Sequence, residues 1–152
     1  MEVIDKYINL WRQIANEFKD YNEYLIFESM DEVYFYDSTI FYFDYTTLRN
    51  LNQAFVDTIR NTGGNNINRL LIVAGANDDY IMTCKSDYKM PVDQSNKLAV
   101  SIHYFEPYNF VYNTYYEPYN STDENGFVFT FGPELKWGNS MEYQQIIEKT
   151  FY

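Results

Sequence analysis

Apolar residues recur every three or four positions in three stretches of the chain, a spacing that places them along one face of an α-helix. It predicts helices over about residues 2–19, over about residues 46–61, and from near Ser140. Gly63 and Gly64 end the second helix, and Ser140 is a good N-cap for the third. The apolar positions are Ile4, Tyr7, Ile8, Trp11, Ile14, Ala15 and Phe18 in the first helix, Leu48, Leu51, Ala54, Phe55, Thr58 and Ile59 in the second, and Met141, Tyr143, Ile146, Ile147 and Phe151 in the third.

Three short apolar runs have the composition of buried strands, at residues 24–30, 70–74 and 97–105. The intervening residues 75–96 and the long Tyr-, Asn- and Pro-rich stretch 106–139 look like loops. Loops this long inside a compact domain are usually functional.

Helices and strands alternate along the chain, which predicts an α/β fold with parallel strands. Two such folds compete: an open doubly wound sheet and a section of a (β/α)8 barrel. No Gly-rich phosphate loop follows any predicted strand, which disfavours the first. Acidic and aromatic residues follow the strands, as at the site-bearing face of a barrel, although a complete barrel needs about 250 residues.

Composition limits the partners that the chain can bind. Its net charge of -11 argues against nucleic acid and anionic membranes, and no apolar run approaches the length of a membrane span of about 20 residues. Aromatic residues make up 20% of the chain, so their rings fill the core or offer surfaces to a neutral ligand such as a sugar. No signal peptide is visible in the first residues, which carry acids early.

Cysteine and histidine each occur once, as Cys84 and His103. A disulfide within the chain is therefore impossible, and a structural zinc site lacks its four N or S ligands. A hydrolytic triad is disfavoured because Cys84 lies in a polar stretch with no link to His103.

Candidate chemistry follows each predicted strand. The first strand is followed by Asp31 and Glu32, the second by the run 75–79, and the third ends in the run 103–105. In a parallel sheet these ends share one rim, so carboxylates, an amide and the imidazole would converge there. Taken singly, each has a simpler interpretation: a solvated turn carboxylate for Glu32, turn capping for 77–79, and a hydrogen-bonded rim residue for His103.

Four separated segments resemble, in order and spacing, the middle of glycoside hydrolase family 5, in particular its endoglucanases. They are "FKDYNEYLIFESMDE", "LNQAFVDTIRNTGGNNINRLLIVAGAN", "YKMPVDQSNKLAVSIHYFEPYNF" and "FGPELKWGN". The family is a (β/α)8 barrel that hydrolyses β-glycosidic bonds with retention. The resemblance implies that residues 1–152 form a single incomplete barrel domain, from about the third helix to the sixth, with three parallel strands.

The resemblance also implies roles for individual residues. Glu32 matches the glutamate that serves as acid/base, and His103 matches a histidine that ends the sixth strand. Asp31, His103 and Tyr104 would position the sugar or partner side chains, and Trp137 would help to form the cleft wall. No metal or organic cofactor is needed.

Three positions depart from the family pattern: Asp31 replaces an asparagine, Val33 a proline and Phe105 a tyrosine. An ionised Asp31 only accepts hydrogen bonds, and Phe105 lacks the hydroxyl that would orient the nucleophile.

The implied activity is cleavage of β-1,4-glucan or a related plant polysaccharide, outside the cell. The family's nucleophile lies after the seventh strand, which this chain does not reach, so we expect a fragment with negligible activity alone. The alternative is a noncatalytic carbohydrate-binding remnant or pseudoenzyme. Exposed barrel edges would also favour self-association.

Overall fold

The computed structural model describes residues 3–37 and 42–105 of the chain. The chain divides into two units, residues 1–103 and residues 104–152, and nearly all described residues belong to the first. The elements are α1 (Val3–Glu17), β1 (Phe27–Glu28), β2 (Tyr36–Asp37), β3 (Tyr42–Phe43), α2 (Tyr45–Asn61), the 3-10 helix η1 (Gly64–Ile67), β4 (Leu71–Asp79), α3 (Tyr80–Thr83) and β5 (Leu98–His103).

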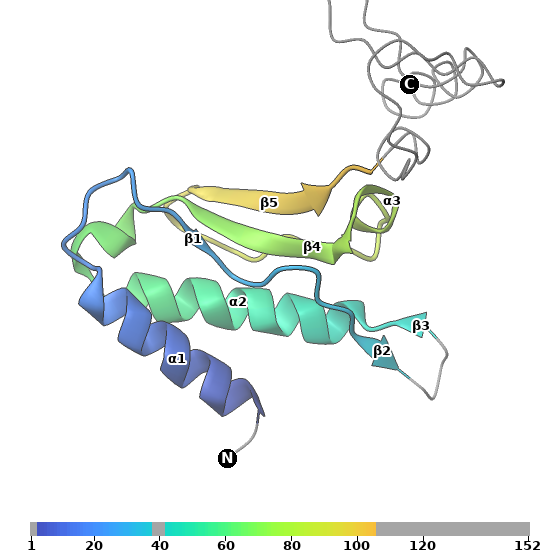
Figure 1. Cartoon of the computed structure of the whole chain (residues 1–152), viewed down its shortest axis with the longest axis horizontal. Helices are drawn as coiled ribbons and strands as arrows, with labels where there is room; N and C mark the ends of the chain where they lie inside the picture. Colours follow the sequence, from blue (N-terminus) through green and yellow to red (C-terminus); the bar gives the residue numbers. More distant parts are fainter. Residues whose placement is uncertain (1–2, 38–41, 106–152) are drawn as a thin grey trace, which may run out of the picture. The chain divides into compact units, whose positions relative to one another are not determined.

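A three-stranded sheet in the order β1-β4-β5 organises the first unit, and both strand pairs are parallel. Figure 1 shows α2 running along one side of this sheet, with α1 beside α2 on the same side. The predicted fold class is confirmed: three consecutive parallel strands with helices between them form part of a (β/α)8 barrel.

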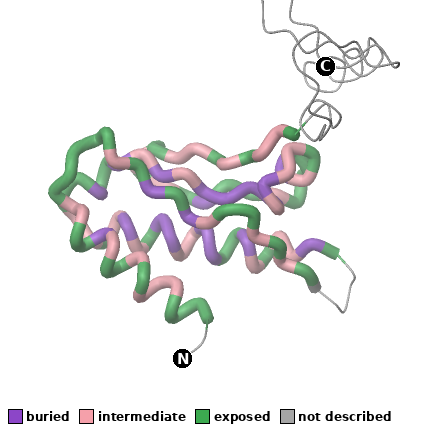
Figure 2. Tube along the Cα trace, in the orientation of Figure 1, coloured by how far each residue is buried: buried purple, intermediate pink, exposed green. Residues whose placement is uncertain are grey.

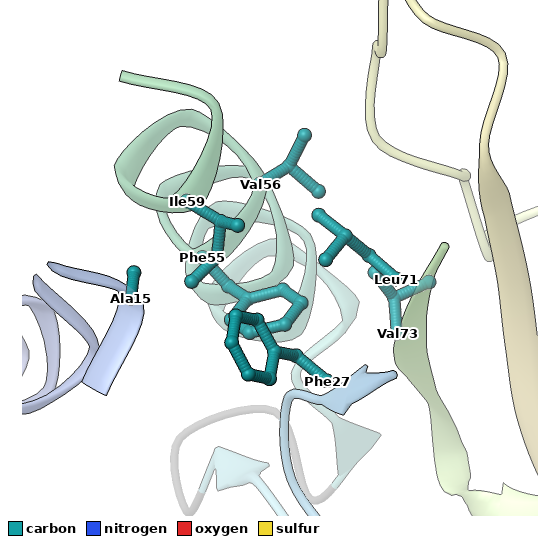
Figure 3. Close-up of a cluster of buried hydrophobic side chains, with 7 residues drawn as sticks. All are labelled: Ala15, Phe27, Phe55, Val56, Ile59, Leu71 and Val73. Atoms are coloured by element: carbon teal, nitrogen blue, oxygen red, sulfur yellow. The ribbon is translucent and has the colours of Figure 1, made fainter. Parts of the chain in front are cut away.

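The core lies between α2 and the sheet. Phe55 on α2 meets Phe27 on β1, while Leu71 and Val73 of β4 approach α2 from the side (Figure 3). Trp11 of α1 closes the cluster, with its ring centroid 4.7 Å from that of Phe55. Figure 2 shows the buried positions concentrated on β4 and on one face of α2. The apolar faces predicted from helical spacing are therefore the faces that pack.

The amino ends of the strands are held by a buried arginine. Arg69 is 1% exposed and donates five hydrogen bonds of 2.6 to 3.1 Å, four of them to backbone carbonyls of the turn that connects α1 to β1. Its guanidinium carbon also lies 4.9 Å from the ring centroid of Phe27. Because this planar group has five donors in fixed directions, it can bind all of these acceptors at once.

A second arginine braces the same end. Arg60 of α2 binds Asp93 in a bidentate ion pair, with Nε to Oδ1 at 2.9 Å and Nη2 to Oδ2 at 3.0 Å. Asp93 also accepts hydrogen bonds from the loop that leads into β5, at Ser95 and the backbone of Lys97. The Arg60 hydrogen bond lowers the pKa of the Asp93 carboxyl far below its usual value.

The predicted elements differ from the observed ones mainly at their ends. The strand expected over 24–30 is reduced to Phe27–Glu28, because Tyr24 and Ile26 are exposed rather than part of the ladder. The strand expected over 70–74 instead runs to Asp79 with a shift of register after Ala74, and α3 lies within the predicted loop 75–96. The β2–β3 hairpin was not predicted.

The helix expected from Ser140 and the loop 106–139 lie outside the described residues. Among the helices that the structure describes, none has the length and apolar character needed to cross a membrane.

Candidate active site

The carboxyl ends of the three parallel strands bring the predicted polar residues together. Glu32, four residues after β1, places its Oε1 2.9 Å from Nδ1 of His103 at the end of β5. Asp31 places its Oδ1 3.3 Å from Nε2 of the same ring. The expectation that Asp31, Glu32 and His103 share one rim is therefore met.

The backbone around Glu32 is held in an unusual conformation. Glu32 has a φ of 49°, and Asn77 and Asp78 at the end of β4 have φ values of 55° and 49°. Residues other than glycine rarely adopt this left-handed backbone conformation, which typically costs about 1 to 2 kcal/mol per residue. Such conformations persist only where surrounding interactions impose them.

Asp78 supplies those interactions. Its side chain is buried, 1% exposed for the residue, and its Oδ2 accepts a hydrogen bond from the backbone N–H of Glu32. Its Oδ1 accepts another from the backbone N–H of Gly75, at 3.2 Å. One buried carboxylate thus ties the loop after β1 to the irregular end of β4.

Gly75 allows the close approach that the end of β4 requires. A Cβ at this position would lie 2.6 Å from the backbone oxygen of Ser101 and 2.6 Å from Oγ1 of Thr83. The same Thr83 hydroxyl accepts a hydrogen bond from the backbone of Ala76, at 2.9 Å. A side chain at Gly75 would therefore push β4 away from β5 just below His103.

A polar network lies beneath the rim, inside the core. Asn52 of α2 is fully buried, and its amide donates to the backbone oxygen of Ala74 at 2.8 Å. Its Oδ1 accepts from the hydroxyl of Ser29, which in turn accepts from the backbone N–H of Ala74. Tyr88 donates a second hydrogen bond to the Ala74 oxygen, at 3.1 Å. These bonds fix the position of β1 along β4, and therefore the positions of the residues that follow each strand.

The charges at the rim favour a protonated imidazole. The hydrogen bond to Glu32 raises the pKa of His103, and burial of the ring opposes this increase. The nearby charges of Asp78 and Asp31 also raise the pKa. Burial raises the pKa of Asp78, opposed by its backbone hydrogen bonds and by the charge of His103. A carboxylate on each side of the ring lets both ring N–H groups of the imidazolium donate.

Asp31 and Glu32 are more exposed to solvent than His103, which they contact. The side chains of Asp31 and Glu32 are 75% and 61% exposed, whereas that of His103 is 30% exposed.

Asp31, Asp78 and His103 bring one donor atom each within 4.8 Å of one another. Both ring nitrogens and both Asp78 oxygens are, however, already used in bonds within the protein, so we assign no metal to this group.

Two predicted site residues lie outside the unit that contains this cluster. Tyr104 follows β5 directly but belongs to the unit 104–152. Trp137 lies outside the described residues. An open groove of about 530 Å³ lies elsewhere, near Arg60 and Asp93, and none of the predicted site residues lines it.

Sequence reasoning found only part of the support for the site. It placed Asp78 at the rim within the run 75–79, with turn capping as the simpler interpretation, and it gave no role to Ser29 or Asn52. Asn52 did carry a signal, because it is a polar residue four positions after Leu48 and three before Phe55, on the apolar face of α2.

The fold and this rim together define a section of a (β/α)8 barrel with acidic groups at the carboxyl ends of its strands, where barrel enzymes build their active sites. The chain matches the model of the Cellulase family, glycosyl hydrolase family 5, over residues 2–148. It therefore belongs to that family.

Individual relatives agree with the family assignment. Endoglucanase A of Paenibacillus barcinonensis is 36% identical over 141 residues, which are 84% of this chain and 32% of that protein. Endoglucanase B of Clostridium cellulovorans is 40% identical over 114 residues. These matches span 32% of the length of the first relative and 26% of the length of the second.

Solved structures show the same fold. A GH5-4 broad specificity endoglucanase from an uncultured bovine rumen ciliate aligns with a TM-score of 0.76 and 46% identity, over 96% of this chain and 40% of that one. A glycoside hydrolase 5 lichenase from Caldicellulosiruptor sp. F32, solved as a mutant with cellotetraose, aligns with a TM-score of 0.70 and 28% identity, over the same shares of the two chains.

Proposed function

We propose that this chain carries the acid/base part of a retaining endo-β-1,4-glucanase site, with Glu32 as the acid/base. The observation that supports this most directly is the 2.9 Å contact between Glu32, which follows β1, and His103, which ends β5, at the carboxyl edge of one parallel sheet. A carboxyl that is exposed to a ligand yet fixed by a partner can protonate a leaving group in a defined direction.

The mechanism has two steps. In the first, the protonated form of Glu32 gives its proton to the glycosidic oxygen while a second carboxylate attacks the anomeric carbon, so the C–O bond to the leaving sugar breaks, an enzyme ester forms, and Glu32 becomes a carboxylate. In the second, the Glu32 carboxylate takes a proton from water as the water oxygen bonds to the anomeric carbon, which breaks the ester C–O bond and releases the second carboxylate. The two carboxyl groups of a retaining site lie about 5 to 5.5 Å apart.

The substrate we propose is a β-1,4-linked glucan or a related plant polysaccharide, acted on outside the cell. Relatives named as endoglucanases, a lichenase solved with cellotetraose and a xyloglucanase solved with a XXXG heptasaccharide support this class. Asp31, His103, Tyr104 and Trp137 are proposed to contribute to the sugar-binding cleft beside Glu32, and the contacts of Asp31 and Glu32 with His103 support the proposal for the first two.

We further propose that residues 1–152 are one incomplete barrel domain whose activity alone is negligible. Relatives that are about three times longer support this, because the attacking carboxylate of the mechanism is expected in a part of the barrel beyond these residues. Removing one member of a catalytic set can lower the rate by about a millionfold.

The test compares a polymer with an activated substrate. Reducing-sugar release from lichenan, xyloglucan and carboxymethyl cellulose is measured alongside cleavage of dinitrophenyl β-cellobioside, whose leaving group needs little protonation. If turnover is found, Glu32→Gln should lower polymer hydrolysis by about 10²- to 10⁴-fold and lower aryl glycoside cleavage far less. An equal loss on both substrates, or none, would contradict the role of Glu32.

A noncatalytic carbohydrate-binding protein is the second candidate. The contact of Asp31 with His103 favours it, because it occupies the imidazole with a carboxylate where the family pattern has an amide. Calorimetric titration with cellotetraose separates the two: saturable binding without hydrolysis supports the binding protein. Hydrolysis by the wild-type chain contradicts both this candidate and the proposed lack of activity.

Self-association through the sheet edges also stays a prediction. Within the described sheet, β1 and β5 each pair on one side only, and Val100 and Ile102 of β5 are 37% and 45% exposed. An unpaired edge with exposed apolar side chains favours pairing with another chain. Sedimentation velocity at several protein concentrations measures it, and a monomer throughout would contradict it.

A further inference from the structure

The imidazole at the rim has a carboxylate on each side. Its Nδ1 lies 2.9 Å from Glu32 and its Nε2 lies 3.3 Å from Asp31. The two carboxylates are adjacent in sequence but reach opposite nitrogens of one ring. The positive φ of Glu32 allows this, because it turns the chain sharply between the two side chains.

The other charged group facing this ring is Asp78. It comes from the end of β4, which pairs with β5 through Asp79 and His103. Its oxygens accept backbone hydrogen bonds, so it contributes charge to the imidazole without being one of the two carboxylates that contact the ring nitrogens. Within the described residues, three carboxylates thus lie around the imidazole, and Asp31 and Glu32 are the two whose oxygens lie within 3.3 Å of a ring nitrogen.

We propose that Asp31 is a positioning residue that binds the Nε2–H of His103 while Glu32 binds the Nδ1–H, so that the ring is held as a cation between the two. A neutral imidazole has one N–H and can donate to only one of these carboxylates. The protonated ring satisfies both. Asp31 thereby keeps a charged partner beside Glu32, and it acts on Glu32 only through the ring.

This inference has a consequence for the proposed reaction, and that consequence rests on the proposed function. When His103 loses its proton, three carboxylates remain around a neutral ring, and the one remaining N–H is divided between Asp31 and Glu32. The orientation of Glu32 then depends on which nitrogen keeps the proton. The arrangement of the rim should therefore change at the pH where His103 titrates, whether or not the chain has any hydrolase activity.

The test uses the fact that the chain contains one histidine. Long-range ¹H–¹⁵N spectra of the wild-type chain, recorded from about pH 5 to about pH 9, give the pKa of His103 and the share of each neutral tautomer without overlap. We expect a pKa above the ordinary value of about 6.5. Asp31→Asn should lower it by about 0.5, the effect of losing one exposed ion pair, and Glu32→Gln should lower it by at least as much.

The tautomers add a readout that a merely structural role would not move. Above the pKa, Asp31→Asn should shift the ring toward the Nδ1–H form, which still donates to Glu32. Glu32→Gln should shift it toward the Nε2–H form. Asp31→Glu keeps the charge and should retain most of the wild-type pKa, which guards against a simple loss of folding in the neutral variant.

Asp20→Asn is the matched control, because it makes the same chemical change in the turn before β1, at the opposite end of the strand from Asp31. It should move the pKa of His103 by no more than about 0.1, because exposed charges farther apart than the Debye length are screened. A wild-type pKa at the ordinary value, or an Asp31→Asn chain with the wild-type pKa and tautomer ratio, would overturn the inference. Neither result depends on hydrolysis, so the proposed function is tested separately.

Discussion

The two ends of the β1-β4-β5 sheet are built on opposite principles. At the amino end, the charged groups are buried and fully bonded: Arg69 binds five acceptors and Arg60 binds both oxygens of Asp93. At the carboxyl end, the charged groups Asp31 and Glu32 are largely exposed and follow a backbone in strained conformations. The amino end is organised for stability, and the carboxyl end holds the exposed groups of the proposed site.

The difference shows what each charge does. A buried guanidinium with five partners can leave only by breaking them all, so it fixes chain segments far apart in sequence. An exposed carboxylate contributes little stability, typically about 0 to 1 kcal/mol for a surface pair. Substitutions at the amino end should therefore change the free energy of unfolding, and substitutions at the carboxyl end should change chemistry at nearly constant stability.

The largest expected effect is at Arg69. Arg69→Met fills similar volume but leaves buried carbonyls of the α1–β1 turn without donors, so we expect a loss of about 4 kcal/mol in the free energy of unfolding. Urea denaturation followed by circular dichroism measures it. Arg49→Met, on the exposed face of α2, is the control and should change stability by less than about 0.5 kcal/mol. Equal effects of the two substitutions would contradict the contrast between the two ends.

Breaking the ion pair at Asp93 should come next. Asp93→Asn leaves Arg60 without its carboxylate and should cost about 3 kcal/mol at neutral pH. The folded protein lowers the pKa of Asp93, so this stability is present above the ordinary carboxyl pKa of about 4 and is lost as the pH falls through the lower, folded value.

Unfolding curves of wild type and Asp93→Asn at several pH values between about 7 and 2.5 check this sign. The two curves should approach each other as the pH falls below about 4. The exposed Asp87→Asn should follow the wild type throughout. A difference that grows in acid would show that the carboxylate is not stabilised by the fold.

Asn52 connects the two ends, because it lies in the core but supports the rim. Asn52→Ala removes its hydrogen bonds to Ala74 and Ser29 and should cost about 2 kcal/mol. Asn50→Ala, two residues earlier and on the exposed face of α2, should be neutral or slightly stabilising, since alanine favours helices. Thermal unfolding of both variants measures the difference, and a mild effect at Asn52 would mean that the network is dispensable.

The smallest effect should appear at Glu32 itself. Its φ of 49° suits glycine, so Glu32→Gly should be more stable than Glu32→Ala by about 1 kcal/mol, although both lose the bond to His103. At Glu28, inside β1, the order should reverse. Paired denaturation curves of these four variants test the claim, and the same order at both positions would show that Glu32 is not strained.

Local patterns predicted the elements but not their irregularities. Helical spacing found α1 and α2, and alternation of helices with apolar runs found the parallel order that brings Glu32 and His103 together. The irregular end of β4 could not be predicted, because one of its residues, Asp78, bonds to the backbone of Glu32 in a loop far away in sequence.

The structural role of Arg69 could not be predicted either, because its partners are far away in sequence. In sequence it ends the polar run "NNINR", which looks like a solvated loop, and four of its five acceptors are carbonyls within residues 18–25 that no side-chain pattern reveals. Tyr24 and Ile26 led to the opposite error, a strand predicted to be too long, because apolar residues before a strand suggested a longer strand than the chain forms.

The bond from Asp78 to the backbone of Glu32 matters for anyone who recombines barrels of this family. The proposed acid/base is set in place by a residue 46 positions later in the chain, on a different strand. A segment exchange with a crossover between the two would transfer the glutamate without the group that orients its peptide. Such chimaeras would keep the expected signature in their sequence and still misplace the carboxyl, so crossovers are better chosen outside residues 32–78.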